Sequence, residues 1–147
     1  MNYGLKLSEF EVGQTIFHEP GKTIFESDNN LFCLLTMNHH PVHLDVEFCK
    51  EHSHGKVLVV GPLIFSLVVG MTVSTVSGKA IANLEYENIK HLKPVSVNDT
   101  IHARTQILDI KISPNGNTGV LYVETHGYNQ HGEDVISFRR RVLFKNE

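Results

Sequence analysis

The sequence predicts an α+β domain in which an antiparallel sheet curls around one buried helix. The run from Gly61 to Val76 is apolar on nearly all sides, which is typical of a helix buried over most of its surface. From Ala80 onward the apolar residues recur with a period of two, broken by turn residues at hairpin spacing. This second pattern indicates consecutive antiparallel strands.

Length and composition restrict the class of protein. The chain has 147 residues, which fits one domain (residues 1–147) with a hydrophobic core. Its net charge of −3 provides no general attraction for nucleic acid. The two cysteines, Cys33 and Cys49, lack metal-type spacing and favour a reducing compartment. No signal peptide is visible, and no apolar run is long enough to span a membrane. We therefore expect a cytoplasmic protein without nucleic-acid or membrane partners.

The N-terminal half is predicted to hold short elements. In chain order they are a strand at Gln14–His18, a turn at Glu19–Lys22, a helix over about residues 28–37, a second short helix at Asp45–His52 and a strand at Lys56–Val60. Ser27 is the expected N-cap of the first helix, because its hydroxyl can accept from a free backbone N–H. Pro41 cannot continue that helix, because it has no N–H to donate.

The C-terminal half is predicted to hold the central helix and most of the sheet. Pro62 at the first helical position opens the helix, and Gly78 is the expected C-cap. Four strands follow, at Ile81–Leu92, Ile101–Ile112, Gly119–Tyr128 and Asp134–Phe144, and we expect them to pair as an antiparallel meander. Such a sheet has an exposed edge, which a homodimer would close.

The segment Asn38–Asp45 concentrates chemically active side chains around Pro41. Its three histidines, His39, His40 and His43, would individually be solvated surface residues in most proteins. We expect no metal, because a proline turn splays the rings and no cysteine or glutamate stands at zinc-type spacing. The chain also lacks a Gly-x-Ser-x-Gly nucleophile elbow and a glycine-rich phosphate loop, and both cysteines lie within apolar helical patterns.

General acid–base catalysis is the remaining interpretation. A histidine such as His43 can both take and give a proton. Asn38 can hold a water or a carbonyl, although its amide cannot transfer a proton, and the Ser66 hydroxyl is spaced to reach it. Backbone N–H groups near Gly61, at the start of the central helix, can stabilise an oxyanion. A base, an orienting amide and an oxyanion hole suit the addition of water to a double bond conjugated to a carbonyl.

Four segments resemble the MaoC-like hydratases, which are single hot-dog domains that hydrate enoyl-CoA thioesters. The segments are Leu35-Thr36-Met37-Asn38-x-His40-Pro41-Val42-His43-Leu44-Asp45, Gly61-x-Leu63-x-x-Ser66-Leu67-Val68-Val69-Gly70, Ala82-Asn83-Leu84-x-Tyr86-Glu87-Asn88, and Leu92-Lys93-Pro94-Val95 with Asp99-Thr100. The resemblance covers nearly the whole chain. It implies a hot-dog fold, hydro-lyase activity and an acyl-CoA substrate, with no cofactor beyond the coenzyme A carried by that substrate.

One position departs from the general (R)-specific enoyl-CoA hydratases, whose motif begins with Asp where this chain has Asn38 and has Asn where it has His40. The variant resembles the subgroup acting on branched C5-dicarboxylic thioesters, namely mesaconyl-CoA and itaconyl-CoA hydratases or the reverse dehydration of β-methylmalyl-CoA or citramalyl-CoA. Our hypothesis is that Asn38 anchors a water, His43 moves its proton and the Gly61 N–H steadies the oxyanion. Part of the subgroup consists of longer two-domain chains, so we expect this chain to close its site by dimerising.

A dicarboxylic acyl-CoA brings a free carboxylate and phosphates, which need cations or donors. The candidate substrate-binding residues are His39, His40, Lys93, Arg104 and Arg140. In a strand Arg140 points opposite to Arg139 and Arg141, so at most one side of this triplet faces a given groove. The alternative for the triplet is a solvated sheet edge.

Three other functions stay open at this point. A general (R)-specific enoyl-CoA hydratase would share the fold and the His43 chemistry. A hot-dog thioesterase needs a carboxylate on or near the central helix, and Gly61–Val76 contains none. A non-catalytic acyl-CoA-binding subunit is compatible with Asn38 in place of the motif Asp. The sequence does not distinguish the dicarboxylic acyl group or the physiological direction.

Overall fold

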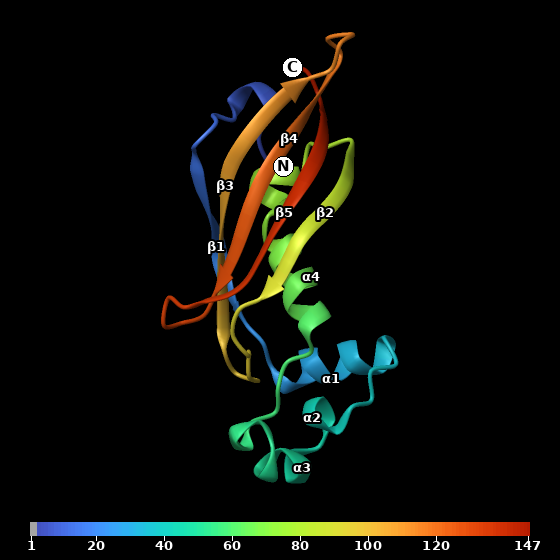
Figure 1. Ribbon diagram of the computed structural model, residues 1–147, viewed down its shortest axis with the longest axis vertical. Coiled ribbons are helices and arrows are strands. Elements are labelled where there is room, and N and C mark those ends of the chain that lie inside the picture. The colour runs from blue at the N-terminus through green and yellow to red at the C-terminus, as the bar shows by residue number, and fades with distance from the viewer. Residues whose placement is uncertain (1–2) are drawn as a thin grey trace.

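The computed structural model describes residues 3–147, except for the side chain of His54. A five-stranded antiparallel sheet of order β1-β3-β4-β5-β2 wraps one long helix, α4, and three short helices gather beyond one end of the sheet (Figure 1). The elements are β1 (Thr15–Thr23), α1 (Glu26–Leu35), α2 (Pro41–Leu44), α3 (Val46–Glu51), α4 (Gly61–Met71), β2 (Ala82–His91), β3 (Thr100–Ile112), β4 (Thr118–Tyr128) and β5 (Asp134–Lys145). The predicted α+β class is confirmed. No helix within residues 3–147 is long and apolar enough to cross a membrane.

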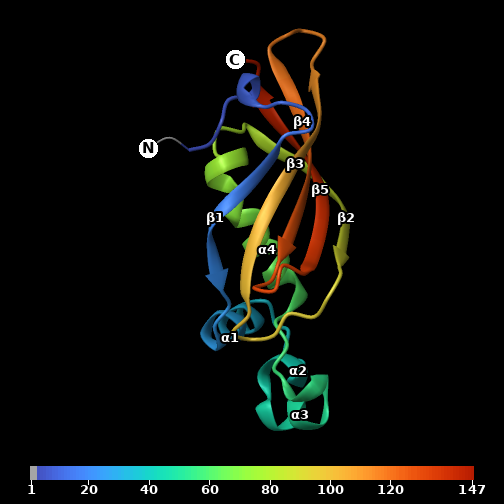
Figure 2. The ribbon, with the colours of Figure 1, turned by 90° about the vertical axis from the view of Figure 1, so that its left-hand side faces the viewer.

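Helix α4 packs against the concave face of the sheet, as Figure 2 shows. Its buried residues Ile64 and Val68 face the core strands. Gly127 of β4 permits this close approach, because a Cβ there would lie 2.7 Å from a methyl of Val68. The opposite stripe of the helix, Pro62, Ser66 and Gly70, is exposed. The predicted burial on nearly every face is therefore wrong for this stripe, because the sheet covers one side of the helix only.

The predicted meander is correct for β3, β4 and β5 and wrong for β2. Strand β2 pairs with β5, at the far edge of the sheet from β1. The connection over residues 92–99 contains Pro94 and is longer than a hairpin turn, so the chain can cross the end of the sheet before β3 begins. Local turn signals do not reveal such a crossing.

Three local predictions also need correction. Strand β1 continues to Thr23 through the predicted turn at Glu19–Lys22, which forms an irregularity in the pairing with β3. Helix α1 begins two residues earlier than expected, and its N-cap is Phe25, whose N–H donates to the Asp28 carboxylate at 2.9 Å; Ser27 lies inside the helix. The predicted strand at Lys56–Val60 forms a single isolated bridge.

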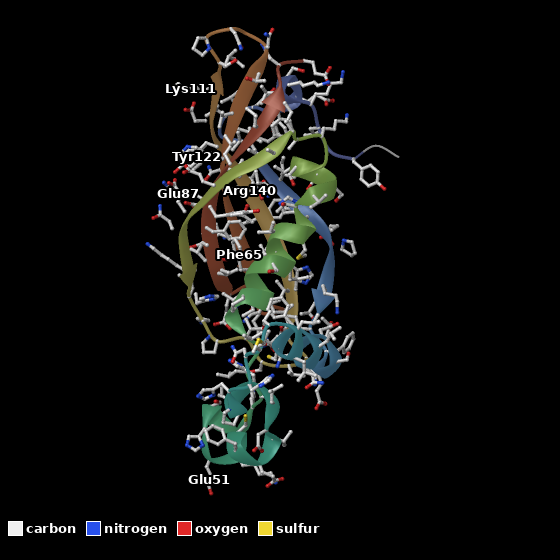
Figure 3. All side chains as sticks on the ribbon, turned by 90° about the vertical axis from the view of Figure 1, so that its right-hand side faces the viewer. Glu51, Phe65, Glu87, Lys111, Tyr122 and Arg140 are labelled. Atoms are coloured by element: carbon white, nitrogen blue, oxygen red, sulfur yellow. The ribbon has the colours of Figure 1, made fainter. Side chains whose placement is uncertain are left out.

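A polar layer lies between the sheet and the C-terminal end of α4. Arg140 of β5 is 0% exposed, and its guanidinium donates to the Thr72 hydroxyl at 2.6 Å, directly after the helix (Figure 3). A cation at a helix C-terminus is favourable, because the last carbonyls are unpaired and the dipole is negative there. His18 of β1, 1% exposed, lies in the same layer between the hydroxyls of Thr75, at 2.6 Å, and Thr105, at 2.7 Å. Burial, and then the positive charge of Arg140, lower the pKa of His18 to about 4.

This buried imidazole predicts a pH-dependent stability. An unfolded histidine binds a proton below about pH 6.5, whereas folded His18 does so only near pH 4. Stability linked to His18 is therefore complete above pH 6.5 and is lost as the pH falls from 6.5 to 4. We expect a loss of about 2 kcal/mol in urea unfolding over this window, allowing for partial solvent screening. Asparagine does not titrate in this range, so the His18→Asn variant should lose less unfolding free energy between pH 6.5 and pH 4. Parallel stability–pH curves for the two proteins would contradict this assignment.

Candidate active site

The short helix α2 presents His43 toward the start of α4. Pro41 opens this helix, and the His40 ring caps it, because His40 Nδ1 accepts the Val42 N–H at 3.2 Å. His43 Nδ1 lies 2.8 Å from the carbonyl oxygen of Leu58. Because a carbonyl can only accept, Nδ1 must carry the proton, and Nε2 of the neutral ring keeps its lone pair. His43 is thus held in the tautomer that a general base requires.

The carbonyl that orients His43 is itself held by Asn29 of α1, which is 1% exposed. The Asn29 amide donates to the carbonyl of His43 at 3.1 Å and to that of Leu58 at 3.3 Å. Its oxygen accepts the N–H of Val60, the residue before α4, at 3.0 Å. One side chain therefore ties together α1, the turn that carries His43 and the entry to the central helix. Sequence reasoning missed Asn29. The signal that could have identified it is its position four residues before Cys33, which puts a polar amide on the buried face of the helix.

A pocket of about 320 Å³ lies beside His43 at the start of α4. Its lining consists of His43, Leu58, Val59, Gly61, Ile64 and the segment from His91 to Val95. The Gly61 N–H has no hydrogen-bond partner among the described residues, and it stands at the positive end of the helix. The next residue, Pro62, has no N–H. Gly61 therefore has an N–H available to an oxygen in the pocket.

The structure brings His43 and Gly61 to one pocket, but it does not place Asn38 or Ser66 in the lining. The Asn38 oxygen accepts the N–H of His40 at 3.3 Å, which closes the turn before α2. Ser66 lies on the exposed stripe of α4. The hydrogen bond expected between Ser66 and Asn38 is not formed among the described residues, because that stripe faces away from the sheet.

Three of the predicted substrate-binding residues lie near this end of the molecule. His39 is exposed, and His40 is occupied as the cap of α2. Lys93 lines the pocket, but its ammonium group is paired with Glu133. Lys93 is thus the one of these three side chains that reaches the pocket lining.

The structure places Arg104 and Arg140 away from the pocket lining. Arg104 alternates with the buried residues of β3, so it points to the face of the sheet opposite α4, where both its terminal nitrogens bond Asp134 at 3.0 Å. Arg140 is sealed in the core against Thr72. Neither guanidinium can meet a ligand in the pocket. Among the described side chains, no three His, Cys, Asp or Glu residues are placed to hold a metal ion.

Comparison with known proteins identifies the family. The family model described as "MaoC like domain" matches residues 8–129. The chain belongs to this family. The mesaconyl-CoA hydratase of Cereibacter sphaeroides is 33% identical over 144 residues, 98% of this chain and 42% of that protein. The beta-methylmalyl-CoA dehydratase of Chloroflexus aurantiacus is 31% identical over 144 residues, with coverages of 98% and 41%. This MaoC-like chain thus spans about two fifths of the length of these relatives.

Solved structures support the same assignment. A MaoC domain protein dehydratase from Chloroflexus aurantiacus matches with a TM-score of 0.92 at 30% identity, covering 99% of this chain and 41% of that one. A Mycobacterium tuberculosis protein described as a double hot-dog fold matches with a TM-score of 0.87 at 19% identity, covering 98% and 45%. The predicted hot-dog fold of this MaoC-like domain is confirmed.

The contacts of Asn29 predict a large effect of its removal on stability. In Asn29→Ala, the Val60 N–H and the His43 carbonyl lose this partner, whereas the Leu58 carbonyl keeps the His43 ring as its donor. Each unsatisfied buried group costs about 1–3 kcal/mol, so we expect a loss of about 3 kcal/mol in the free energy of unfolding. The matched control is Asn30→Ala, an exposed neighbour on the same helix, which should change stability by less than about 0.5 kcal/mol. Equal unfolding free energies for the two variants, measured in urea, would refute the bridging role.

Proposed function

We propose that this domain is a hydratase that adds water reversibly to the double bond of a branched C5-dicarboxylic enoyl-CoA, such as mesaconyl-CoA or itaconyl-CoA. The observation that carries the proposal is the pocket shared by a base and an oxyanion donor: His43 with a free Nε2, and Gly61 with an unpaired N–H. The names of the two relatives, one a hydratase and one a dehydratase of related CoA esters, support this substrate class. The scheme requires no cofactor beyond the coenzyme A of the substrate.

The mechanism follows from these groups. Neutral His43 takes a proton through Nε2 as the water oxygen bonds to Cβ and the double-bond electrons move toward the thioester. The Gly61 N–H donates to the thioester oxygen and stabilises the enolate, at a place where a fixed donor needs no reorganisation. His43, now an imidazolium, returns the proton to Cα and regains its starting state. The role of Asn38 in this scheme is to hold the attacking water through its NH2 group, since its oxygen already accepts the His40 N–H.

An assay of enoyl-thioester absorbance tests this function. We expect decay with mesaconyl-CoA and itaconyl-CoA. Replacing the base in His43→Ala should lower kcat by about 10²–10⁴-fold, the usual contribution of a general base. The matched control is His131→Ala, an exposed histidine outside the pocket lining, which should retain wild-type turnover. Near wild-type turnover in His43→Ala would end the scheme, and hydrolysis to free coenzyme A would indicate a thioesterase.

Asn38 has its own test in the same assay. Asn38→Asp restores the carboxylate of the general hydratase motif, and we expect turnover of unbranched crotonyl-CoA to rise relative to that of mesaconyl-CoA. An unchanged ratio would show that Asn38 does not select the substrate. Absence of turnover with every enoyl-CoA, together with acyl-CoA binding, would favour a non-catalytic binding subunit.

We also propose that the domain works as a homodimer joined through β2. This strand has a neighbour on one side only, and its large apolar side chains are exposed. They are Ile81, Leu84, Tyr86, Ile89 and, just after the strand, Leu92. A second copy pairing along β2 would extend the sheet and cover part of this apolar surface; β2 forms the sheet edge beside α4 (Figure 3). A cytoplasmic location is part of the proposal, because both cysteines are buried free thiols.

Sedimentation tests the dimer. Leu84 is 51% exposed on β2, so Leu84→Glu should shift micromolar protein from dimer to monomer by placing a charge in the interface. Ile112→Glu is the control, because Ile112 is 45% exposed at the end of β3, away from this edge. A monomeric wild type, or equal dimer fractions in the two variants, would refute the β2 interface.

A further inference from the structure

His91 is a second imidazole in the pocket, and the proposed mechanism does not use it. It is the last residue of β2 and lines the pocket together with His43 and Gly61. Its ring lies against Gly61: a Cβ at Gly61 would be 2.9 Å from Nε2 and 3.0 Å from Cε1 of His91. Because glycine has no Cβ, position 61 leaves room for the His91 ring.

The ring of His91 is available to a ligand. Among the described residues no side chain or backbone group hydrogen-bonds to it, whereas the ring of His43 is held by the Leu58 carbonyl. Lys93 is the other cationic residue of the lining, and its ammonium group is already paired with Glu133. His91 is thus the polar side chain of the pocket with no assigned partner.

We propose that His91 binds the free carboxylate of a dicarboxylic acyl-CoA and so selects this substrate class over monocarboxylic acyl-CoA. The inference rests on the proposed function, because it assigns the second carboxylate of the same substrate. The rest of the lining near the helix start is largely apolar, with Ile64, Val59 and Val95. A carboxylate entering such a pocket needs a donor or a cation, and the N–H of the His91 imidazole can supply the donor.

The spacing of the groups fits this assignment. With the thioester oxygen on the Gly61 N–H, an extended four-carbon chain places its far carboxylate about 4 Å from the thioester carbon, given C–C bonds of about 1.5 Å. A ring in van der Waals contact with Gly61 lies within hydrogen-bond reach of a group at that distance. His43 then remains free to act on the carbons between the two anchored ends.

Binding of two saturated acyl-CoAs tests the proposal without any catalysis. Succinyl-CoA and butyryl-CoA have four-carbon acyl chains that differ only in the terminal carboxylate. We expect wild-type domain to bind succinyl-CoA more tightly in calorimetry. His91→Leu should weaken succinyl-CoA about 10–100-fold, the loss of one hydrogen bond to a charged group, and leave butyryl-CoA within about two-fold. His91→Lys supplies an N–H donor and a positive charge, and should keep part of the preference.

His131→Leu is the control variant, because His131 lies in the exposed turn between β4 and β5 and outside the pocket lining. Unchanged butyryl-CoA binding in His91→Leu shows that the variant is folded. Equal weakening of both ligands, or a succinyl-CoA affinity that His91→Leu leaves intact, would overturn the role of His91. Failure of the hydration assay with an intact succinyl-CoA preference would instead refute the proposed function and leave the carboxylate site standing.

Discussion

The geometry of the candidate site depends on the side-chain amide of Asn29. Helices α1, α2 and α3 lie beyond the end of the sheet, where no strand ladder fixes them (Figure 1). Asn29 supplies the missing constraint by bonding the carbonyls of His43 and Leu58 and the N–H of Val60. These three backbone groups belong to the segment with the base and to the segment that starts α4. This buried amide is costly to replace, since an apolar side chain would leave the Val60 N–H and the His43 carbonyl without this partner.

Helix α4 is anchored at both ends by polar side chains from other elements. Asn29 holds the residue before its first turn, and Arg140 holds Thr72 after its last turn. A buried cation without a carboxylate partner is normally unfavourable, but here hydrogen bonds to Thr72 and Asn83 and the negative end of the helix dipole offset part of the desolvation cost. The unpaired N–H of Gly61 is consequently presented to the pocket by a helix that is fixed along its length, which is the condition for a preorganised oxyanion donor.

The sequence predicted the local features well and the non-local ones poorly. The start of α4 at Gly61 and the limits of β3 and β4 follow from patterns within a few residues. The position of β2 depends on which strand it meets across the sheet, and no local pattern encodes that. The burial of Arg140 was missed for the same reason: alternation shows that Arg140 points opposite to its neighbours, but not which of the two faces is closed by the helix.

The pocket and the proposed dimer share one strand, and this links ligand binding to assembly. His91 ends β2, whose outer edge is unpaired in the single chain. A second copy paired along β2 would fix that strand and with it the imidazole over Gly61. A ligand bound by His91 and a dimer contact along β2 would then both stabilise the same position of β2. Because coupling between two binding events is reciprocal, a dicarboxylic acyl-CoA would tighten the dimer by the same factor by which dimerisation tightens its binding.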